Sequence, residues 1–394
     1  MWSKKKHEEG YAAIIDVHSG SVGIAIVFTE NAEKDPEIIF AHREHITITE
    51  NPDTPGLIRA LQRALFSVAL QFSGEGQNAL KAHDPYGKIT KTLFVCGAPW
   101  AQTATRFIQI EDKEPFIISE DKVRALILEA ERRDEEELKT TTLLKELNIS
   151  LIERAVIHTT VNGYPLNNPY GKKGKEMTLA HISGLIPEPI LQSIHDMQDK
   201  ILMHTTRTSH TFALVLFCVL RDIYPEHKHA LFIDISAEAT EICVMQDEIL
   251  LETYVFPYGT HTFIRDLATH LKTFPDEALT HLREYGENTP PNIRTSIEYV
   301  QEIYTKYLTE AYHTLGERYI IPRHFFLITS RKLDVFFDIL VKKISEKYTE
   351  PHGSFISLNN AVLPKTENAT QTADVFFSLE ARFFHKRHGC GEIT

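Results

Sequence analysis

The beginning of the chain alternates short apolar runs with small and polar residues. An apolar run from Ala12 to Ile15 ends at Asp16, the turn Ser19-Gly20-Ser21 follows, and a second apolar run returns from Val22 to Phe28. Short apolar runs bounded by turn residues are typical of buried β-strands. The pattern predicts a strand with an acidic residue at its end, a tight turn and a returning strand.

The same arrangement occurs again about two hundred residues later. An apolar strand runs from Ala230 into Asp234, a turn follows, a second strand returns from Ile242 to Met245, and a Tyr-Gly turn then leads into a helix. An Asp at a strand end can hold a cation-bound water while the amides and hydroxyls of the turn face a phosphate. The two units therefore predict a duplicated nucleotide-binding fold.

The residues between the two units are predicted to form a separate subdomain. A polar stretch with Gly and Pro, from Ser73 to Lys88, indicates a boundary. After it the pattern predicts a strand over Lys91–Cys96, a helix from Ser119 to about Arg133, and strands over Ser150–Val161 and Lys175–Ile186. The predicted order is strand, helix, strand, strand.

Helices and one strand are predicted for most of the remaining chain. Helix-forming residues dominate residues 188–222, and Asp276–Gly316 is predicted to be helical with a break at Pro290-Pro291. A strand over Phe325–Thr329 and a helix from Leu333 to Ser345 follow.

Composition sets broad limits on the class of protein. The chain has 394 residues, of which 42% are apolar and 24% charged, as expected for a soluble globular protein with more than one lobe. The formal net charge of −12 argues against nucleic acid as the main partner. The cysteines at 96, 218, 243 and 390 lack metal-binding spacing and are expected to be free thiols in a reducing compartment. The longest apolar run, Thr211–Leu220, has about half of the roughly 20 residues that a bilayer span needs, and the amino terminus does not resemble a secretion signal.

Several motifs resemble the actin-like ATPase superfamily, and within it proteins of the FtsA and PilM type. The two Asp-and-turn units resemble the two phosphate loops of the superfamily. Between residues 162 and 181, Asn168-Pro169-Tyr170-Gly171 and the following Gly174 resemble a turn of the inserted subdomain in FtsA-type proteins. Ile118-Ser119-Glu120-Asp121 and the segment from Pro275 to Gly286 resemble two further family segments.

The resemblance spans nearly the whole chain. It implies an α/β protein with a duplicated, ribonuclease-H-like actin fold in two lobes and an inserted strand-helix-strand-strand subdomain of the SHS2 type. The implied divisions are 1–88 (first lobe with the first phosphate loop), 89–187 (inserted subdomain), 188–225 (first lobe, continued), 226–350 (second lobe with the second phosphate loop and a helical arm) and 351–394 (C-terminal return helix and tail).

The same resemblance implies a set of nucleotide contacts. If ATP binds, the contacting residues are Asp16, Ser19, Gly20, Ser21, Asp234, Ser236, Thr240 and Gly259. Mg²⁺ would accompany the nucleotide and be held through water by Asp16 and Asp234. The alternative is that both aspartates only end buried strands, because Asp favours turns by accepting hydrogen bonds from backbone amides.

The sequence departs from the family pattern at each nucleotide loop. Ser236-Ala237-Glu238 stands where the second phosphate loop usually has glycines, and His18 stands where the first has Gly. Ser330-Arg331-Lys332-Leu333 replaces a Gly-rich adenosine loop. A Cβ hinders the close approach of backbone to phosphate, and a Glu repels a triphosphate. These departures favour a pseudo-ATPase, which keeps the fold and has lost or reduced nucleotide turnover.

Two surface segments have two interpretations each. Residues 372–388 form either an amphipathic membrane anchor or a final helix that packs back on the first lobe. The basic turn Lys172-Lys173-Gly174-Lys175 either meets an acidic partner or a neighbouring copy, or is a solvated β-turn.

The expected function is that of a cytoplasmic scaffold of the FtsA and PilM type, which links an assembly to the inner face of a membrane in cell division or in pilus biogenesis. A protein partner or a second copy would bind residues 89–187, and membrane contact would be peripheral, through a partner or the C-terminal helix. The competing hypothesis is an active ATPase or a sugar-kinase-like phosphotransferase. A kinase would need a further acidic base and intact glycine turns, and neither can be picked out in the sequence.

Overall fold

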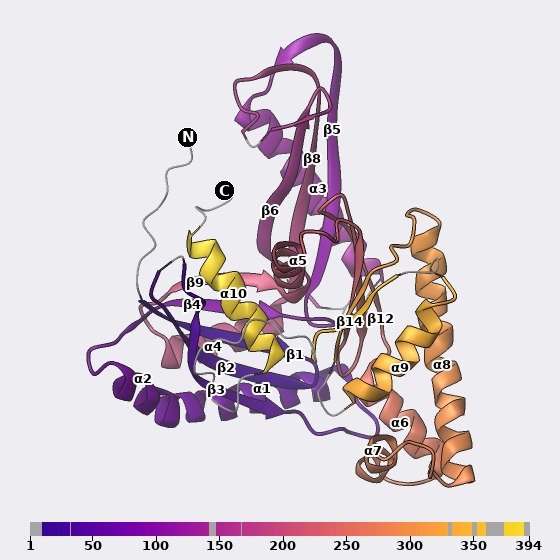
Figure 1. Ribbon diagram of the computed structural model, residues 1–394. Coiled ribbons are helices and arrows are strands. Elements are labelled where there is room, and N and C mark those ends of the chain that lie inside the picture. Colours follow the sequence, from indigo (N-terminus) through magenta and orange to yellow (C-terminus); the bar gives the residue numbers. More distant parts are fainter. Residues whose placement is uncertain are drawn as a thin grey trace.

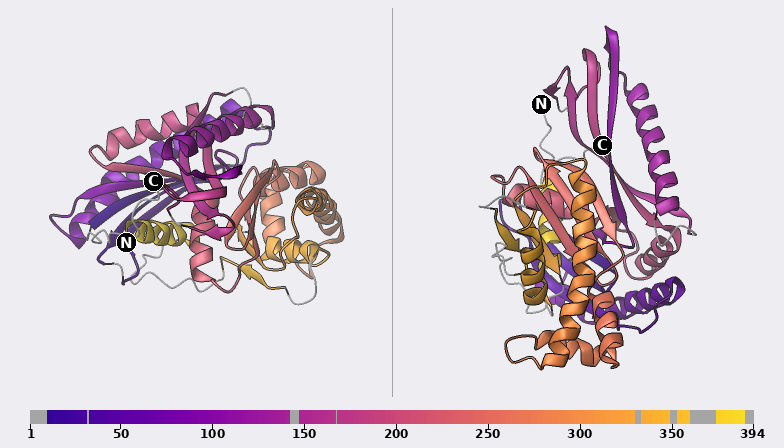
Figure 2. Two further views of the ribbon diagram at one scale, coloured as in Figure 1. Left: turned by 90° about the horizontal axis from the view of Figure 1, so that it is seen from above. Right: turned by 90° about the vertical axis from the view of Figure 1, so that its right-hand side faces the viewer.

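The molecule consists of two lobes and one inserted subdomain. The computed structural model describes residues 10–31, 33–141, 147–166, 168–329, 333–348, 353–359 and 374–389. Over these residues it forms two five-stranded sheets and one four-stranded sheet. The two lobes lie side by side, and the inserted subdomain projects away from the first lobe (Figures 1 and 2).

The sheet of the first lobe has the strand order β3-β2-β1-β4-β9. Strands β1 and β2 and strands β2 and β3 pair antiparallel, whereas β4 pairs parallel with both β1 and β9. The strand bounds are β1 Gly10–His18, β2 Ser21–Thr29, β3 Glu37–His45, β4 Ile89–Cys96 and β9 Thr206–Thr211.

Helices cover both faces of this sheet, and the side chains of β1 alternate between them. Ala13 and Ile15 pack in the core on the side of α1 and α4, whereas Ala12 and Ile14 pack on the side of α5 and α10. A central strand that is buried on both faces reads as a continuous apolar run, which is why it was predictable. The helix bounds are α1 Thr54–Gln71, α2 Gln77–His83, α4 Glu188–Ile201, α5 Phe212–Ile223 and α10 Val375–Gly389.

The sheet of the second lobe repeats the first in strand order and direction. Its order is β12-β11-β10-β13-β14, with antiparallel pairing among the first three strands and parallel pairing of β13 with β10 and β14. The predicted duplication is therefore confirmed. The bounds are β10 Ala230–Ile235, β11 Thr240–Gln246, β12 Ile249–Phe256, β13 Phe325–Thr329, β14 Phe355–Ser357, α6 Thr260–Leu271, α7 Pro275–Arg283, α8 Pro291–Gly316 and α9 Asp334–Ser345.

The inserted subdomain is an antiparallel sheet with one helix on one face. Its strand order is β5-β8-β6-β7, and α3 packs on it through Val123 and Ala130. The bounds are β5 Gln102–Ile117, α3 Glu120–Thr141, β6 Ile149–Val161, β7 Tyr164–Pro165 and β8 Lys173–Pro187.

Two predictions about this region were wrong. The strand Lys91–Cys96 belongs to β4 of the first lobe, where it pairs with β1 and β9, and the first strand of the inserted sheet is β5, which was not predicted. Residues 111–114 of β5 are all exposed, so its distal half lacks the alternation of a strand with one buried face. The polar stretch 73–88 was predicted to mark a boundary. The helical run instead continues into it, because the π-helical turn Phe72–Gly76 connects α1 directly to α2.

The helix α5 joins the cores of the two lobes. Phe217 and Leu216 on α5 belong to one apolar cluster with Phe232 of β10 and Phe326 of β13. Burying one such side chain contributes about 1.5 to 3 kcal/mol. All of the apolar run Thr211–Leu220 except Thr211, the last residue of β9, thus lies in this largely buried helix. None of the helices within the described residues has the length and apolar character that crossing a membrane requires.

The helix α10 packs back on the sheet of the first lobe. Phe377, Leu379 and Ala381 are fully buried there, and Phe383 and Phe384 are nearly so. Of the two interpretations of residues 372–388, the structure shows the packed helix over 375–389. Residues 360–373, the cysteine at 390 and Ser330-Arg331-Lys332 lie outside the described residues; the other three cysteines are free.

Candidate functional site

The turns of the two duplicated hairpins meet between the lobes. The hydroxyl groups of Ser19, in the β1–β2 turn, and Ser236, in the β10–β11 turn, are 3.1 Å apart. The backbone amide of Glu238 also donates to Ser19 Oγ at 3.0 Å. A Cβ on Gly20 would lie 2.7 Å from Cβ of Ala237. The two turns are therefore in van der Waals contact and hydrogen-bonded to each other.

A cavity of about 560 Å³ lies beside these turns and is lined by both lobes. The first lobe lines it with the β1–β2 turn, the end of β3 and the start of α10, and the second lobe with the ends of β10 and β13 and the starts of α6 and α7. The lining includes His18, Gly20, Ser21, His42, Arg43, His45, Asp234, Ser236, His261, Asp276, Thr329, Leu333, Asn359, Asp374 and Phe376.

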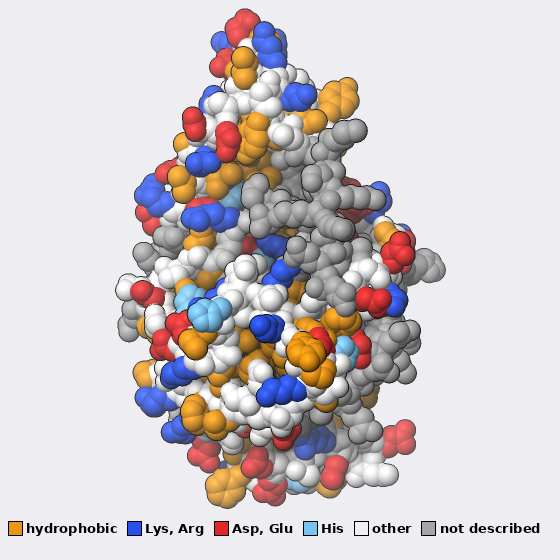
Figure 3. Space-filling model, turned by 90° about the vertical axis from the view of Figure 1, so that its left-hand side faces the viewer, with side chains coloured by type: hydrophobic (Ala, Val, Ile, Leu, Met, Phe, Trp, Pro, Cys, Tyr) orange, Lys and Arg blue, Asp and Glu red, His pale blue; other side chains and the backbone are white. Residues whose placement is uncertain are grey.

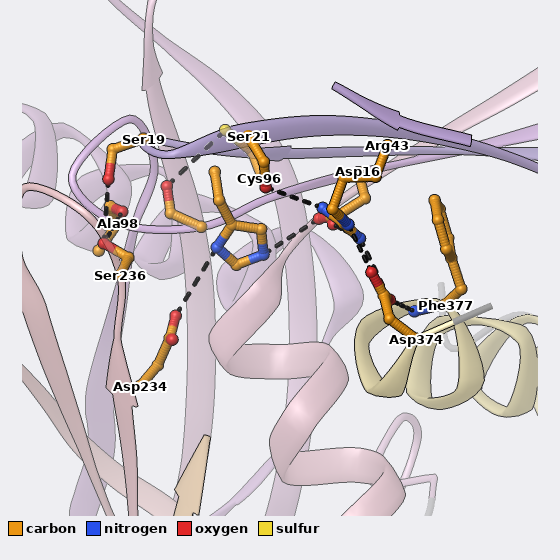
Figure 4. A network of polar contacts seen from close by, with 12 residues as sticks. Asp16, Ser19, Ser21, Arg43, Cys96, Ala98, Asp234, Ser236, Asp374 and Phe377 are labelled. Carbon is orange, nitrogen blue, oxygen red and sulfur yellow. Dashed lines mark hydrogen bonds and ion pairs between the residues drawn. The ribbon is translucent and has the colours of Figure 1, made fainter. Parts of the chain in front are cut away.

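The imidazole ring of His18 stands between Asp16 of β1 and Asp234 of β10. Both aspartates are labelled in Figure 4. Nε2 of the ring lies 3.0 Å from Asp16 Oδ1 and its Nδ1 lies 3.8 Å from Asp234 Oδ2. All three side chains are buried. Burial alone would lower the pKa of His18, but the neighbouring Asp16 and Asp234 carboxylates outweigh it and raise the pKa above the usual value.

Arg43 of β3 engages the other side of Asp16. Its Nη2 lies 2.6 Å from Asp16 Oδ2, and its Nε donates to Asp374 Oδ2 at 2.5 Å. Asp374 in turn accepts a hydrogen bond from the amide of Phe377 and so caps α10 (Figure 4). Burial would raise the pKa of Asp16, but His18 and Arg43 hold it well below its usual range.

Further buried carboxyl groups surround Asp16 and His18. Burial raises the pKa of Asp234 to about 6 against the opposing effect of His18, and burial together with the charge of Asp234 raises that of Glu241 to about 8. Burial and the charge of Asp16 keep the pKa of Glu380, on α10, well above its usual range. Neither carboxylate oxygen of Asp234 accepts a hydrogen bond from any described residue.

Glu238 at the tip of the second turn does not face an open phosphate site. Its carboxylate accepts hydrogen bonds from Arg265 Nη1 at 3.0 Å and Nη2 at 2.5 Å, and His261 Nδ1 lies 3.6 Å away. Burial would raise the pKa of Glu238, but His261 and Arg265 lower it to about 2. The acidic side chain at this turn is thus paired with basic side chains of its own lobe.

The residues predicted to contact ATP fall into two groups. Gly20, Ser21, Asp234 and Ser236 line the cavity, whereas Asp16, Ser19, Thr240 and Gly259 do not. Thr240 is buried in the second lobe, where its hydroxyl donates to the carbonyl oxygen of Tyr258 at 2.7 Å. A Cβ on Gly259 would lie 2.4 Å from the carbonyl oxygen of Ser236, so this glycine serves the packing of the turn.

Several residues at this site could not be found from the sequence. Arg43, Asp374 and Glu380 come from β3 and α10, and no motif connects them with Asp16. Arg265 and His261 lie on α6, one helical turn apart, and their common target Glu238 is visible only in the fold.

The residues present do not fit a magnesium-bound triphosphate in this arrangement. Both oxygens of Asp16 contact basic side chains, the ring of His18 fills the space toward Asp234, and the two turns touch where phosphates would need backbone amides. Among the described residues, no three His, Cys, Asp or Glu side chains form a group suited to a metal ion.

Comparison with known proteins identifies the fold. No family model and no curated protein sequence matches the chain significantly. The structure of the PilM-PilN type IV pilus biogenesis complex is similar over 98% of this chain and 100% of that chain, with a TM-score of 0.59 and 14% sequence identity. A protein with actin-like ATPase fold from Bacteroides thetaiotaomicron matches over 96% of this chain and 97% of that chain with a TM-score of 0.42 and 9% identity. The ethanolamine utilization protein EutJ from Carboxydothermus hydrogenoformans matches over 96% and 92% with a TM-score of 0.45 and 9% identity. The chain has the actin-like ATPase fold, as the resemblance implied.

Proposed function

We propose that this chain is a cytoplasmic scaffold with an actin-like fold, which docks a protein partner in a pilus-type assembly at the inner face of a membrane and does not turn over ATP efficiently. The observation that carries the proposal is the direct contact between the two turns. In a nucleotide-binding site of this kind, amides and hydroxyls at such turns face the phosphates. Here the Ser19 and Ser236 hydroxyls and the Glu238 amide are used in contacts between the turns.

Similarity to a protein complex supports the docking role. The neighbour with the TM-score of 0.59 is the PilM-PilN complex, and its match covers nearly the whole of both chains. A fold can serve unrelated functions, so this likeness counts here only together with the geometry of the cleft. The combination favours the pilus-type scaffold over the division-type scaffold and over an active phosphotransferase.

The inserted subdomain is the proposed docking surface. It projects from the lobes (Figure 1), and its turn at Lys172, Lys173 and Lys175 is exposed. A cluster of exposed lysines on an acidic chain is suited to bind an acidic protein segment. On the face drawn in Figure 3, the basic and acidic side chains of the described residues are interspersed, which is unlike the basic stripe of a nucleic-acid-binding protein.

Two measurements test the proposal. First, radiometric hydrolysis assays with Mg²⁺ and ATP should show turnover no faster than that of the Asp234→Ala variant. Hydrolysis that is abolished by this substitution would mean that the chain is an active ATPase.

Second, the chain should be purified with its bound partners from cells, in the original form and as the triple Lys172→Glu, Lys173→Glu, Lys175→Glu variant. The matched control is Arg124→Glu, Arg132→Glu, Arg133→Glu on α3, where the three arginines pair with glutamates of the same helix. We expect a stoichiometric partner that is lost from the lysine variant and kept by the arginine variant. Loss from both variants, or from neither, would contradict docking at this turn.

A further inference from the structure

We propose that the side chain of His18 ties the two lobes together, from the place between Asp16 and Asp234 where a nucleotide-bound metal ion would otherwise act. The inference deepens the proposed function, since a scaffold needs a fixed angle between its lobes.

The geometry of the ring supports a bridging role. The two nitrogens of His18 face carboxylates of different lobes: Nε2 faces Asp16 of β1 and Nδ1 faces Asp234 of β10. The two hairpins occupy the same place in their sheets, because β1 and β10 are the central strands of sheets with the same order. One side chain therefore connects equivalent positions of the two halves.

The ring is held in this position by packing on several sides. Phe212 of α5 and Phe376 of α10 each contact it edge-on, with centroids 4.8 Å from the imidazole centroid. A Cβ on Gly97, after β4, would lie 2.5 Å from the ring atoms Cε1 and Nδ1, so only glycine leaves room for the ring there. His18 itself is only 4% exposed. A ring confined in this way cannot swing aside without movement of its neighbours.

The ring lies among several buried ionisable side chains. Asp16 of β1 and Asp234 of β10 face the ring directly. Glu241 of β11 and Glu380 of α10 lie around these two aspartates, and burial raises the pKa values of both glutamates. The basic group is Arg43 of β3, which contacts Asp16 on the side away from His18. The thiol of Cys96 on β4 is buried nearby, and burial keeps its pKa well above the usual value, so it adds no charge.

The same contacts explain why the site does not fit a magnesium-bound nucleotide. A metal ion shared by the lobes would need the oxygens of Asp16 and Asp234 that His18 contacts. The remaining oxygen of Asp16 is 2.6 Å from Arg43. In this chain, the ring of His18 and the guanidinium group of Arg43 therefore occupy the positions beside these oxygens that a metal ion would need.

Hydrogen exchange at the turn between the lobes tests the proposal. The amide of Glu238 donates across the lobe boundary to Ser19 Oγ, so its exchange rate reports separation of the two turns. The variants are His18→Gln, Asp234→Asn and the double variant, each measured by mass spectrometry on peptides that cover residues 236–240. Using both single variants keeps the test decisive if one of them fails to fold.

If His18 ties the lobes, the Glu238 amide exchanges at least tenfold faster in each single variant than in the unaltered chain. In the double variant it exchanges within twofold of the rate in the faster single variant, because the two substitutions remove the same interaction. The matched control is His229→Gln with Asp247→Asn, an exposed pair at 3.6 Å within the second lobe, which should leave the exchange unchanged. Unchanged exchange in His18→Gln, or effects of the two substitutions that multiply, would overturn the proposal. ATP turnover by the unaltered chain would instead refute the proposed function, whatever the exchange rates.

Discussion

Ser19 and Ser236 are hydrogen-bonded through their hydroxyl groups at 3.1 Å, although 217 residues separate them in the chain. The contact joins equivalent turns of the two duplicated units, each of which follows the central strand of its sheet. Ser236 Oγ also lies 2.9 Å from the carbonyl oxygen of Ala98, to which it can donate. The site is therefore a contact between the two halves of the molecule, which can be perturbed from either side.

Removing the ring of His18 should open the cleft to a nucleotide. We expect His18→Gly to bind ATP with Mg²⁺ at least tenfold more tightly than the unaltered chain, because Asp16 and Asp234 lose the side chain that stands between them. Isothermal titration calorimetry measures the affinity. His229→Gly is the control for loss of an exposed histidine. If affinity does not increase even when Ser236, Ala237 and Glu238 are also changed to Gly, the cleft has lost more than these loops.

Gly20 and Ala237 should show compensating substitutions. A Cβ on Gly20 would lie 2.7 Å from Cβ of Ala237, so Gly20→Ala should push the turns apart and cost about 1 to 3 kcal/mol of stability. Ala237→Gly removes the opposing Cβ and should recover most of that loss in the double variant. Urea unfolding curves measure both effects. Gly74→Ala, where no atom lies within 4 Å of the new Cβ, should cost nothing. Additive losses in the double variant would show that the turns do not press on each other.

The lowered pKa of Glu238 predicts a pH-dependent contribution to stability. The pKa falls from 4.5 to about 2 on folding, so the carboxylate stabilises the folded state above pH ~4.5, and this stabilisation is lost as the pH falls toward ~2. Glu238→Gln should therefore lower the free energy of unfolding by up to ~3 kcal/mol at pH 7 and by progressively less below pH ~4.5. Unfolding by urea at a series of pH values measures the difference. A difference that does not depend on pH would mean that Arg265 and His261 do not lower this pKa.

Part of this architecture could be predicted from local sequence, and part could not. The duplication was predictable because each unit combines an apolar strand, an aspartate and a turn within about twenty residues. The assignment of β4 and β5 failed because the sheet that a strand joins is decided by tertiary pairing. Nothing in the run Lys91–Cys96 indicates that it pairs with β1.

The residues of the candidate site likewise divide into those that local sequence could predict and those that it could not. Asp16 and Asp234 were predicted because each follows an apolar run, and His18 was noticed because it stands where the resemblance implies a glycine. The sequence did not show that the ring of His18 lies between the two carboxylates, since that depends on how the lobes close. Arg43 and Glu380 were missed because the strand and helix that bring them to Asp16 lie far apart in the chain.

Arg43 should be far more important for the docking of α10 than an exposed ion pair on the same helix. Its guanidinium group contacts Asp16 and Asp374 and lies over the rings of Phe376 and Phe377, 5.2 and 4.8 Å from their centroids. Arg43→Gln leaves Asp16 buried with one cationic partner fewer, which costs about 3 to 5 kcal/mol for a broken buried pair. Since Asp374 also caps α10, we expect this helix to be released before the rest of the first lobe unfolds. Two measurements report this release: limited proteolysis, which cleaves α10 only when the helix has left the lobe, and hydrogen exchange over residues 375–389.

The control is Lys386→Gln, which removes a pair with Asp222 on the outside of α10. The side chain of Lys386 is 52% exposed, so this substitution should cost no more than ~1 kcal/mol and leave exchange over α10 nearly unchanged. If the two variants behaved alike, packing of Phe377, Leu379 and Ala381 alone would hold α10 in place. The charge network around Asp16 would then be a consequence of that packing, and Arg43 would serve only to neutralise a buried aspartate.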